Sequence, residues 1–221
     1  NYTVPSVSSK ITLIIGSNVN SSSKIWLASG SPRRQALLHQ IQLPFVVLKI
    51  PPEQDPEQCT CRAVDETATQ FALRLSKQKA EIAATIITEN ALPIMPILTA
   101  DTVVTDQETV YGKPVSLEDA REMLSSLSGR THHVITAVTL CTPDKAYYQT
   151  VATTSVTFAP LTAEKIDRYL SSCTVLDKAG GYAIQEYAGL FVSEIRGSYS
   201  NVVGLPLFET ARLLETAGIQ W

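Results

Sequence analysis

The sequence predicts a mixed α/β or α+β fold, and three observations carry that prediction. Apolar runs of strand-like composition alternate with stretches of helical periodicity along the chain. The 221 residues, 44% hydrophobic and 18% charged, are enough for one substantial core or for two small lobes that share a cleft. The loops are short and no internal repeat occurs, which favours a single folded unit.

The predicted boundary of that unit lies near Lys24. Residues 1–23 are rich in Ser, Asn and Thr, and three consecutive serines precede the first convincing strand. We therefore predict a flexible N-terminal extension over 1–23 and a single domain over 24–221.

The unit opens with a strand, a tight turn and a helix. Residues 25–28 form a short apolar strand, and the helix over 32–41 has Ser31 as its N-cap and a proline at its first position. A second strand is predicted over 45–48. A proline-rich acidic loop, 51–56, follows, and we expect it to be mobile or functional.

Two amphipathic helices come next. From Val64, apolar residues recur at the three-and-four spacing of a helix, and Lys79 lies on the same stripe. The second helix starts at Ser116, with Asp119 in a capping-box pattern, and stops at Gly129. Further strands are predicted over 94–104, 133–140 and 151–158, and further helices over 161–171 and 207–216.

Composition argues against two classes of partner. The formal net charge of −3 disfavours a general nucleic-acid binder, because such domains carry a basic excess over one face. No apolar run approaches the roughly 20 residues of a membrane helix, and the apolar segment 11–15 is too short for a typical signal core. We expect a cytoplasmic protein with no nucleic-acid or membrane partner. Its oligomeric state is open, with a homodimer as one alternative.

Arg33 and Arg34 occupy the first turn of a predicted helix, where the macrodipole disfavours cations. A bound phosphate would explain them, because free backbone N–H groups, the hydroxyls of Ser29 and Ser31 and two guanidinium groups would converge on one anion. The alternative is a pair of solvated arginines that face outward. The turn by itself therefore suggests an anion site without establishing one.

Asp101 interrupts an apolar run between Ile94 and Val104. Burial of an unpaired charge is costly or forces protonation, so such a carboxylate is usually paired, metal-bound or at the edge of a cleft. The alternative is a structural Asp bonded to backbone amides or to a neighbouring lysine. We favour a role in a site.

Lys79 and Lys113 are further candidates, because a lysine supplies a point charge for phosphate oxygens. Lys79 lies on the buried stripe of its helix, and Lys113 stands in a Gly-Lys-Pro turn. The alternatives are a lysine that extends from its helix to water and an ordinary exposed turn. His132 and His133 precede a β-branched run, and we predict a structural role for both.

Six motifs occur in order along the chain: LASGSPRRQ at 27–35, ADTVV at 100–104, GKP at 112–114, LSGRTH at 127–132, DKAGGYAIQ at 177–185 and GSYSNVVGLP at 197–206. Together they resemble the Maf family of nucleotide pyrophosphatases. The likeness runs from Ile25 to the C-terminus, and so long an ordered set of motifs is specific.

The resemblance implies hydrolysis of a nucleoside triphosphate to the monophosphate and pyrophosphate, with a divalent metal, Mg²⁺ or Mn²⁺. It also implies a strongly bent mixed sheet flanked by helices, with two lobes around a nucleotide cleft, as in inosine-triphosphatase-like proteins. Asp101 would be the general base or a metal ligand, two roles that the pattern does not separate, and Glu53 in the acidic loop would be a metal ligand. The phosphates would be held by Ser29, Arg33, Arg34, Lys79 and Lys113.

The resemblance also bears on the base of the nucleotide. Arg33, Thr102 and Gln185 match the dTTP/UTP-type branch, whereas the 7-methylguanosine-type branch typically has an acidic residue at the position of Gln185. A neutral amide offers both a donor and an acceptor, which suits the edge of uracil or thymine. We therefore predict a dTTP/UTP pyrophosphatase, with modified pyrimidine triphosphates as further candidate substrates. The alternatives are a 7-methylguanosine- or purine-type triphosphate pyrophosphatase and a nucleotide-binding cell-division regulator with little turnover.

Overall fold

The computed structural model describes residues 14–15, 24–59, 62–106 and 109–221. Its centre is a mixed eight-stranded sheet in the order β1-β3-β2-β4-β6-β7-β8, with β5 beside β4. The strands are β1 (Ile14–Ile15), β2 (Ile25–Leu27), β3 (Phe45–Val47), β4 (Ile97–Thr105), β5 (Val110–Tyr111), β6 (Thr131–Cys141), β7 (Tyr147–Phe158) and β8 (Val192–Arg196). The α-helices are α1 (Pro32–Gln40), α2 (Pro56–Cys59), α3 (Ala68–Glu89), α4 (Leu117–Leu127), α5 (Ala163–Ser172), α6 (Tyr199–Val203) and α7 (Leu207–Thr216), and the 3₁₀ helices are η1 (Pro52–Gln54), η2 (Ala179–Gly181) and η3 (Tyr187–Phe191).

Strand β2, a tight turn and helix α1 form the first unit, as predicted. β2 runs parallel to both of its neighbours, β3 and β4, and its residues are buried. The Ser31 hydroxyl accepts the backbone N–H of Arg34 at 3.5 Å, and Pro32 begins the helix. The cap and the proline therefore start α1 immediately beyond the buried strand.

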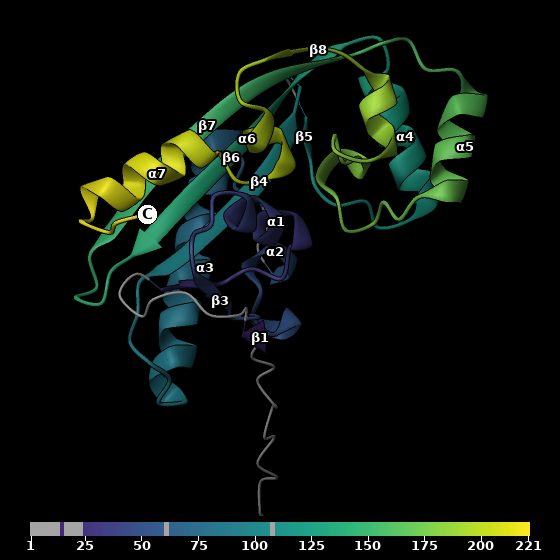
Figure 1. Cartoon of the computed structure of the whole chain (residues 1–221). Coiled ribbons are helices and arrows are strands. Elements are labelled where there is room, and N and C mark those ends of the chain that lie inside the picture. Colours follow the sequence, from purple (N-terminus) through teal and green to yellow (C-terminus); the bar gives the residue numbers. More distant parts are fainter. Residues whose placement is uncertain (1–13, 16–23, 60–61, 107–108) are drawn as a thin grey trace, which may run out of the picture.

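The long strands β4, β6 and β7 join two ends of the molecule. β2 pairs with the first part of β4, at Ile97 and Leu98, while β5 pairs with its last part, at Val104 and Thr105. Helices α1, α2 and α3 gather at the first of these ends, and α4 and α5 gather at the other (Figure 1). The predicted mixed sheet with flanking helices is confirmed.

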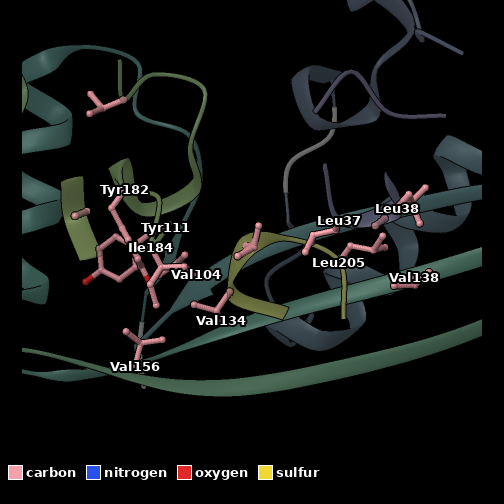
Figure 2. Close-up of a cluster of buried hydrophobic side chains, with 14 of the residues drawn as sticks. Leu37, Leu38, Val104, Tyr111, Val134, Val138, Val156, Tyr182, Ile184 and Leu205 are labelled. Carbon is pink, nitrogen blue, oxygen red and sulfur yellow. The ribbon is translucent and has the colours of Figure 1, made fainter. Parts of the chain in front are cut away.

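One apolar layer runs beneath both ends (Figure 2). It contains Leu37 and Leu38 of α1, Val134 and Val138 of β6, and Tyr182 from the loop before η3. Full burial of a large aliphatic side chain contributes about 1.5–3 kcal/mol. The two ends are therefore held together by a common core as well as by the sheet.

The boundaries of some strands differ from the prediction. β4 begins at Ile97 rather than at residue 94, because Pro96 has no N–H group to donate to a strand ladder. β7 begins at Tyr147, four residues before the predicted start. The sheet also includes Ile14–Ile15, which pair with β3, although the sequence placed them in the extension. The rest of the predicted extension, 1–13 and 16–23, lies outside the described residues.

Several short elements were not predicted from the sequence. β8 is an edge strand whose side chains are mostly exposed, so it has no continuous apolar run. α2 and α6 have four and five residues, too few for a helical period to be recognised. None of the helices within the described ranges combines the length and apolar character that crossing a bilayer requires.

Candidate phosphate-binding site

A cavity of about 380 Å³ lies between the two ends of the molecule. Its walls come from the β2–α1 turn, the α2 segment, the turn after β5, the segment 177–185 and the end of α6. Seven of the predicted site residues line it: Ser29, Arg33, Arg34, Lys79, Thr102, Lys113 and Gln185. Asp101 and Glu53 are not among the lining residues.

The β2–α1 turn forms one wall of this pocket. The hydroxyl oxygen of Ser29 accepts the backbone N–H of Ser31 and an N–H of the Arg34 guanidinium, each at 3.2 Å. Both lone pairs of that oxygen are therefore occupied, and Ser29 can act toward a ligand only as a donor. A donor beside the start of α1 is suited to an anion.

Arg34 is buried, with 8% of its surface exposed, and it connects three elements. Its guanidinium donates to Ser29 in the β2–α1 turn at 3.2 Å, to Thr102 in β4 at 3.1 Å and to the carbonyl of Gly204 at 2.8 Å. Three of its five N–H groups are used in this way. No described residue accepts from the other two, so they remain for a ligand in the pocket that Arg34 lines.

Arg33 contacts the opposite wall. It donates to the carboxylate of Asp177 at 3.1 Å and to the carbonyl of the same residue at 3.3 Å. Burial opposes ionisation of Asp177, but the hydrogen bonds from Lys178 and Arg33 outweigh it and lower its pKa. The alternative of two outward-facing arginines is therefore wrong, since Arg34 is buried and Arg33 is held across the pocket.

Lys79 lies between two carboxylates. Its ammonium group is 2.7 Å from Asp101 in β4 and 2.5 Å from Glu57 in α2, and only 5% of the residue is exposed. Burial alone would lower the pKa of Lys79, but the two carboxylates outweigh it and raise the pKa. Lys79 therefore stays charged inside the protein, and it does not extend to water.

Asp101 lies beneath the pocket, with 1% of its surface exposed. Burial raises its pKa to about 6; Lys79 opposes this shift, and the neighbouring Glu57 carboxylate adds to it. Thr102, the next residue of β4, points to the other face of the sheet, as alternation in a strand requires. The motif at 100–104 thus supplies a carboxylate to one face of the sheet and a hydroxyl to the other.

Glu57 is paired with two lysines. It binds Lys79 and also accepts from Lys113, which reaches it from the other end of the molecule. Burial would raise the pKa of Glu57, but Lys79 and Lys113 hold it well below the ordinary value. Glu57 is therefore ionised at any physiological pH.

The structure places Glu57, and not the predicted Glu53, beside the basic side chains of the pocket. Glu53 is exposed in η1 and does not line the pocket, whereas Glu57, one helical turn further along the chain, does. The sequence contained a signal for Glu57 that was missed. Asp55 accepts the backbone N–H of Glu57 at 3.1 Å, so Asp55, Pro56 and Glu57 form a helix start with a cap, a proline and an acidic residue.

The carboxylates are compatible with a divalent metal that binds together with a phosphate. No group of three or more His, Cys, Asp or Glu side chains surrounds a metal position among the described residues. Mg²⁺ in phosphate-binding sites is commonly held by one or two carboxylates together with substrate oxygens. Asp101 and Glu57 would supply such carboxylates, and a bound ion would compete with Lys79 for them.

The remaining predicted residues lie at different depths. Gln185 is exposed at the edge of the pocket, and its amide is 3.4 Å from the carboxylate of Glu186. His132 is fully buried; it forms a 2.7 Å hydrogen bond with the hydroxyl of Tyr182, and burial lowers its pKa to about 4. A neutral histidine enclosed by aromatic rings supports the structural role predicted for it.

Lys178 is a pocket residue that sequence reasoning did not select. It is 4% exposed, and its ammonium group lies 2.8 Å from Asp177 and 3.6 Å from Glu186. The motif at 177–185 contained it, but only the folded chain shows that its charge is enclosed beside the pocket.

Fold and site together define an α/β protein with a cationic pocket at a helix N-terminus, with the carboxylate of Glu57 in its wall and that of Asp101 beneath it. The family described as Maf-like protein matches residues 24–217. The chain belongs to this family, which confirms the resemblance found in its motifs.

Similar proteins match over nearly the whole chain. The identity is 44% over 195 residues to a dTTP/UTP pyrophosphatase of Ralstonia nicotianae, covering 88% of this chain and 94% of that protein. It is 45% over 198 residues to a dTTP/UTP pyrophosphatase of Bordetella avium, covering 89% and 96%. A solved dITP/XTP pyrophosphatase of Mycobacterium abscessus is 16% identical, with a TM-score of 0.40 over 63% of this chain and 76% of that one, a likeness too weak to support an argument.

Proposed function

We propose that this protein hydrolyses dTTP and UTP to the nucleoside monophosphate and pyrophosphate. The observation that carries the proposal is the Asp101–Lys79–Glu57 cluster beside the N-terminus of α1. Pyrophosphate release needs cations around a triphosphate and a carboxylate near the attacked phosphorus. The names of the similar proteins support the same activity.

The donors for the triphosphate come from both ends of the molecule. Ser29 has a free proton, Arg34 has two side-chain N–H groups available, and the backbone N–H of Arg33 in the first turn of α1 has no partner among the described residues. Lys113 and Arg33 are paired with carboxylates in the structure. We expect phosphate oxygens to take over these two cations when substrate enters, which moves Glu57 and Asp177 to other partners.

The two carboxylates differ in a way that suggests separate roles. Asp101, with a pKa raised to about 6, accepts a proton more readily than Glu57, whose pKa is held low. Asp101 is therefore the better candidate for general base toward water, and Glu57 for metal ligand. A bound Mg²⁺ or Mn²⁺ would supply charge stabilisation on the phosphate oxygens.

Access of water to Asp101 depends on Lys79, whose ammonium group donates a hydrogen bond to one of the Asp101 carboxylate oxygens at 2.7 Å. Because Lys79 also lines the pocket, the phosphates of a substrate compete for its ammonium group. We expect that competition to free the Asp101 oxygen for an attacking water. We further infer that the substrates are free nucleotides rather than nucleic acid, which the net charge of −3 supports, and we propose a cytoplasmic location.

A screen of canonical and modified nucleoside triphosphates for pyrophosphate release tests the proposal. With Mg²⁺ or Mn²⁺ present, dTTP and UTP should be the preferred substrates, and Asp101→Asn should lower kcat about 100-fold or more. Asp144→Asn, on the exposed turn after β6, is the matched control and should keep wild-type turnover. Saturable dTTP binding without pyrophosphate release under any metal would instead indicate a nucleotide-binding regulator.

A further inference from the structure

A buried row of hydroxyl groups lies behind the pocket wall and ends at Arg34. Thr102 on β4 and Thr136 on β6 are direct cross-strand partners, and their hydroxyl oxygens are 2.9 Å apart. Arg34 donates to Thr102 at 3.1 Å, and Thr136 donates to the backbone carbonyl of Asn201 in α6 at 3.1 Å. Thr136 and Asn201 are fully buried and do not line the pocket, so neither touches a ligand there.

The hydrogen bonds in this row can have only one direction. A carbonyl oxygen only accepts, so Thr136 gives its single proton to Asn201. Thr136 must then accept from Thr102, which uses the single proton of Thr102. A guanidinium has only donors, so Arg34 occupies a lone pair of Thr102.

Asn201 fixes the far end of the row to the sheet. Its side-chain amide donates to the carbonyl of Val134 and to the hydroxyl of Thr154, each at 2.9 Å. The same helix, α6, lies against β6 and β7 and holds Arg34 a second time, through the carbonyl of Gly204 that follows it (Figure 1). The guanidinium is thus oriented by groups that are themselves anchored.

We propose that Thr136 and Asn201 are positioning residues that hold the Arg34 guanidinium in one orientation toward the substrate's phosphates. This inference rests on the proposed function and deepens it. Because the only proton of Thr102 is directed to Thr136, Thr102 cannot donate to a ligand, and Arg34 occupies one of the two lone pairs of its oxygen. Thr136 and Asn201 touch no ligand in the pocket, so their effect on phosphate binding should be the same for every nucleotide.

Substitutions of Thr136 distinguish the contribution of its hydroxyl group to activity from the contribution of its side-chain shape. Thr136→Val removes both hydrogen bonds of this hydroxyl and should lower kcat/KM about tenfold for dTTP, UTP and GTP alike. Thr136→Ser, which keeps the hydroxyl, should retain wild-type turnover. Thr139→Val is the matched control, because Thr139 is equally buried on the same strand but bonds Ser76 on the opposite face of the sheet.

A binding measurement keeps the inference separate from the proposed function. Calorimetric titration with inorganic tripolyphosphate, which has no base, should show about tenfold weaker binding to Thr136→Val than to wild type. If wild type hydrolyses no nucleoside triphosphate, the proposed function fails, yet weaker tripolyphosphate binding still supports the positioning role. Unchanged tripolyphosphate binding overturns that role.

A double-mutant cycle tests whether Thr136 acts through Arg34. In an Arg34→Lys background, Thr136→Val should have no further effect on kcat/KM or on tripolyphosphate binding. An equal loss in both backgrounds, or a changed ratio of dTTP to GTP turnover, would overturn the inference. If Thr136→Val does not fold, Thr102→Val and Thr102→Ser test the preceding link of the row in the same assays.

Discussion

At the scale of single residues, the main difference between the sequence prediction and the structure is which of two neighbouring carboxylates lies beside the basic side chains of the pocket. Glu53 and Glu57 lie in the same acidic segment, and only Glu57 contacts Lys79 and Lys113. The helix start at residues 55–57 is a local signal for Glu57, but only the folded chain shows that this side chain meets the two lysines. Substitutions of Glu53 and of Glu57, compared in the same assay, distinguish the roles of the two residues.

Glu57→Gln should lower kcat about 100-fold or more, because the neutral amide neither holds a metal nor balances the two ammonium groups. Glu53→Gln should stay within about twofold of wild type, as expected for an exposed position away from the chemistry. Steady-state pyrophosphate release at saturating dTTP measures both variants. The reverse ranking would return the metal-ligand role to Glu53.

Gln185 carries the prediction on base choice. Its exposed amide at the pocket edge offers a donor and an acceptor, whereas a carboxylate only accepts. Gln185→Glu should lower kcat/KM for dTTP and UTP by about tenfold or more and reduce the preference for pyrimidines over GTP. Gln149→Glu, on β7 outside the pocket, is the control for the added charge. An unchanged preference would contradict the assignment.

At the scale of elements, a buried ion pair between Lys79 and Asp101 joins α3 to β4. Lys79 neutralises Asp101 and Glu57, and removal of one partner from a buried ion pair typically destabilises a protein by about 3–5 kcal/mol. This loss of stability should depend on pH, because the two carboxylates can take up protons once the ammonium group is gone.

Lys79→Met should therefore lower the free energy of unfolding more at pH 8 than at pH 5. Without Lys79 the pKa values of both carboxylates rise, so their carboxyl groups bind more protons in the folded variant than in folded wild type. The difference in the free energy of unfolding between wild type and variant therefore grows as pH increases. Urea unfolding across this range measures the difference. Lys77→Met, at an exposed position of the same helix, should change stability by less than about 0.5 kcal/mol. A deficit that shrinks with rising pH would contradict the coupling.

At the scale of the whole molecule, the two ends share long strands and one apolar layer (Figures 1 and 2). Neither group of helices has a separate sheet, since β4, β6 and β7 serve both. The pocket lies where the ends meet, so its cations and carboxylates keep their spacing only while both ends are folded.

Unfolding should accordingly be a single transition. In a Trp221→Phe variant, Trp26 in β2 is the one remaining tryptophan and reports on the end that carries α1. Its fluorescence and the far-ultraviolet circular dichroism of the whole chain should change together with urea. Loss of part of the circular dichroism signal before Trp26 responds would show that the end with α4 and α5 unfolds separately.

Much of the fold could be predicted because its main signals are local. The cap at Ser31, the apolar stripe around Lys79 and the motif at Asp101 each depend on residues a few positions apart, and all three lie in or beside elements that the structure contains. The short elements β8 and α6 could not be predicted, because they are too polar or too brief to show a period, and α2 is marked only by the capping residues at its start.

The sequence alone determined which residues of the site are cations, hydroxyls and carboxylates, and it placed Ser29 and Arg34 at the start of a helix through local capping chemistry. Only the tertiary structure decided which of these groups meet. The pairing of Arg33 with Asp177 and that of Lys113 with Glu57 join segments that are far apart in the chain. Such contacts depend on strand register and side-chain direction, which no local pattern encodes.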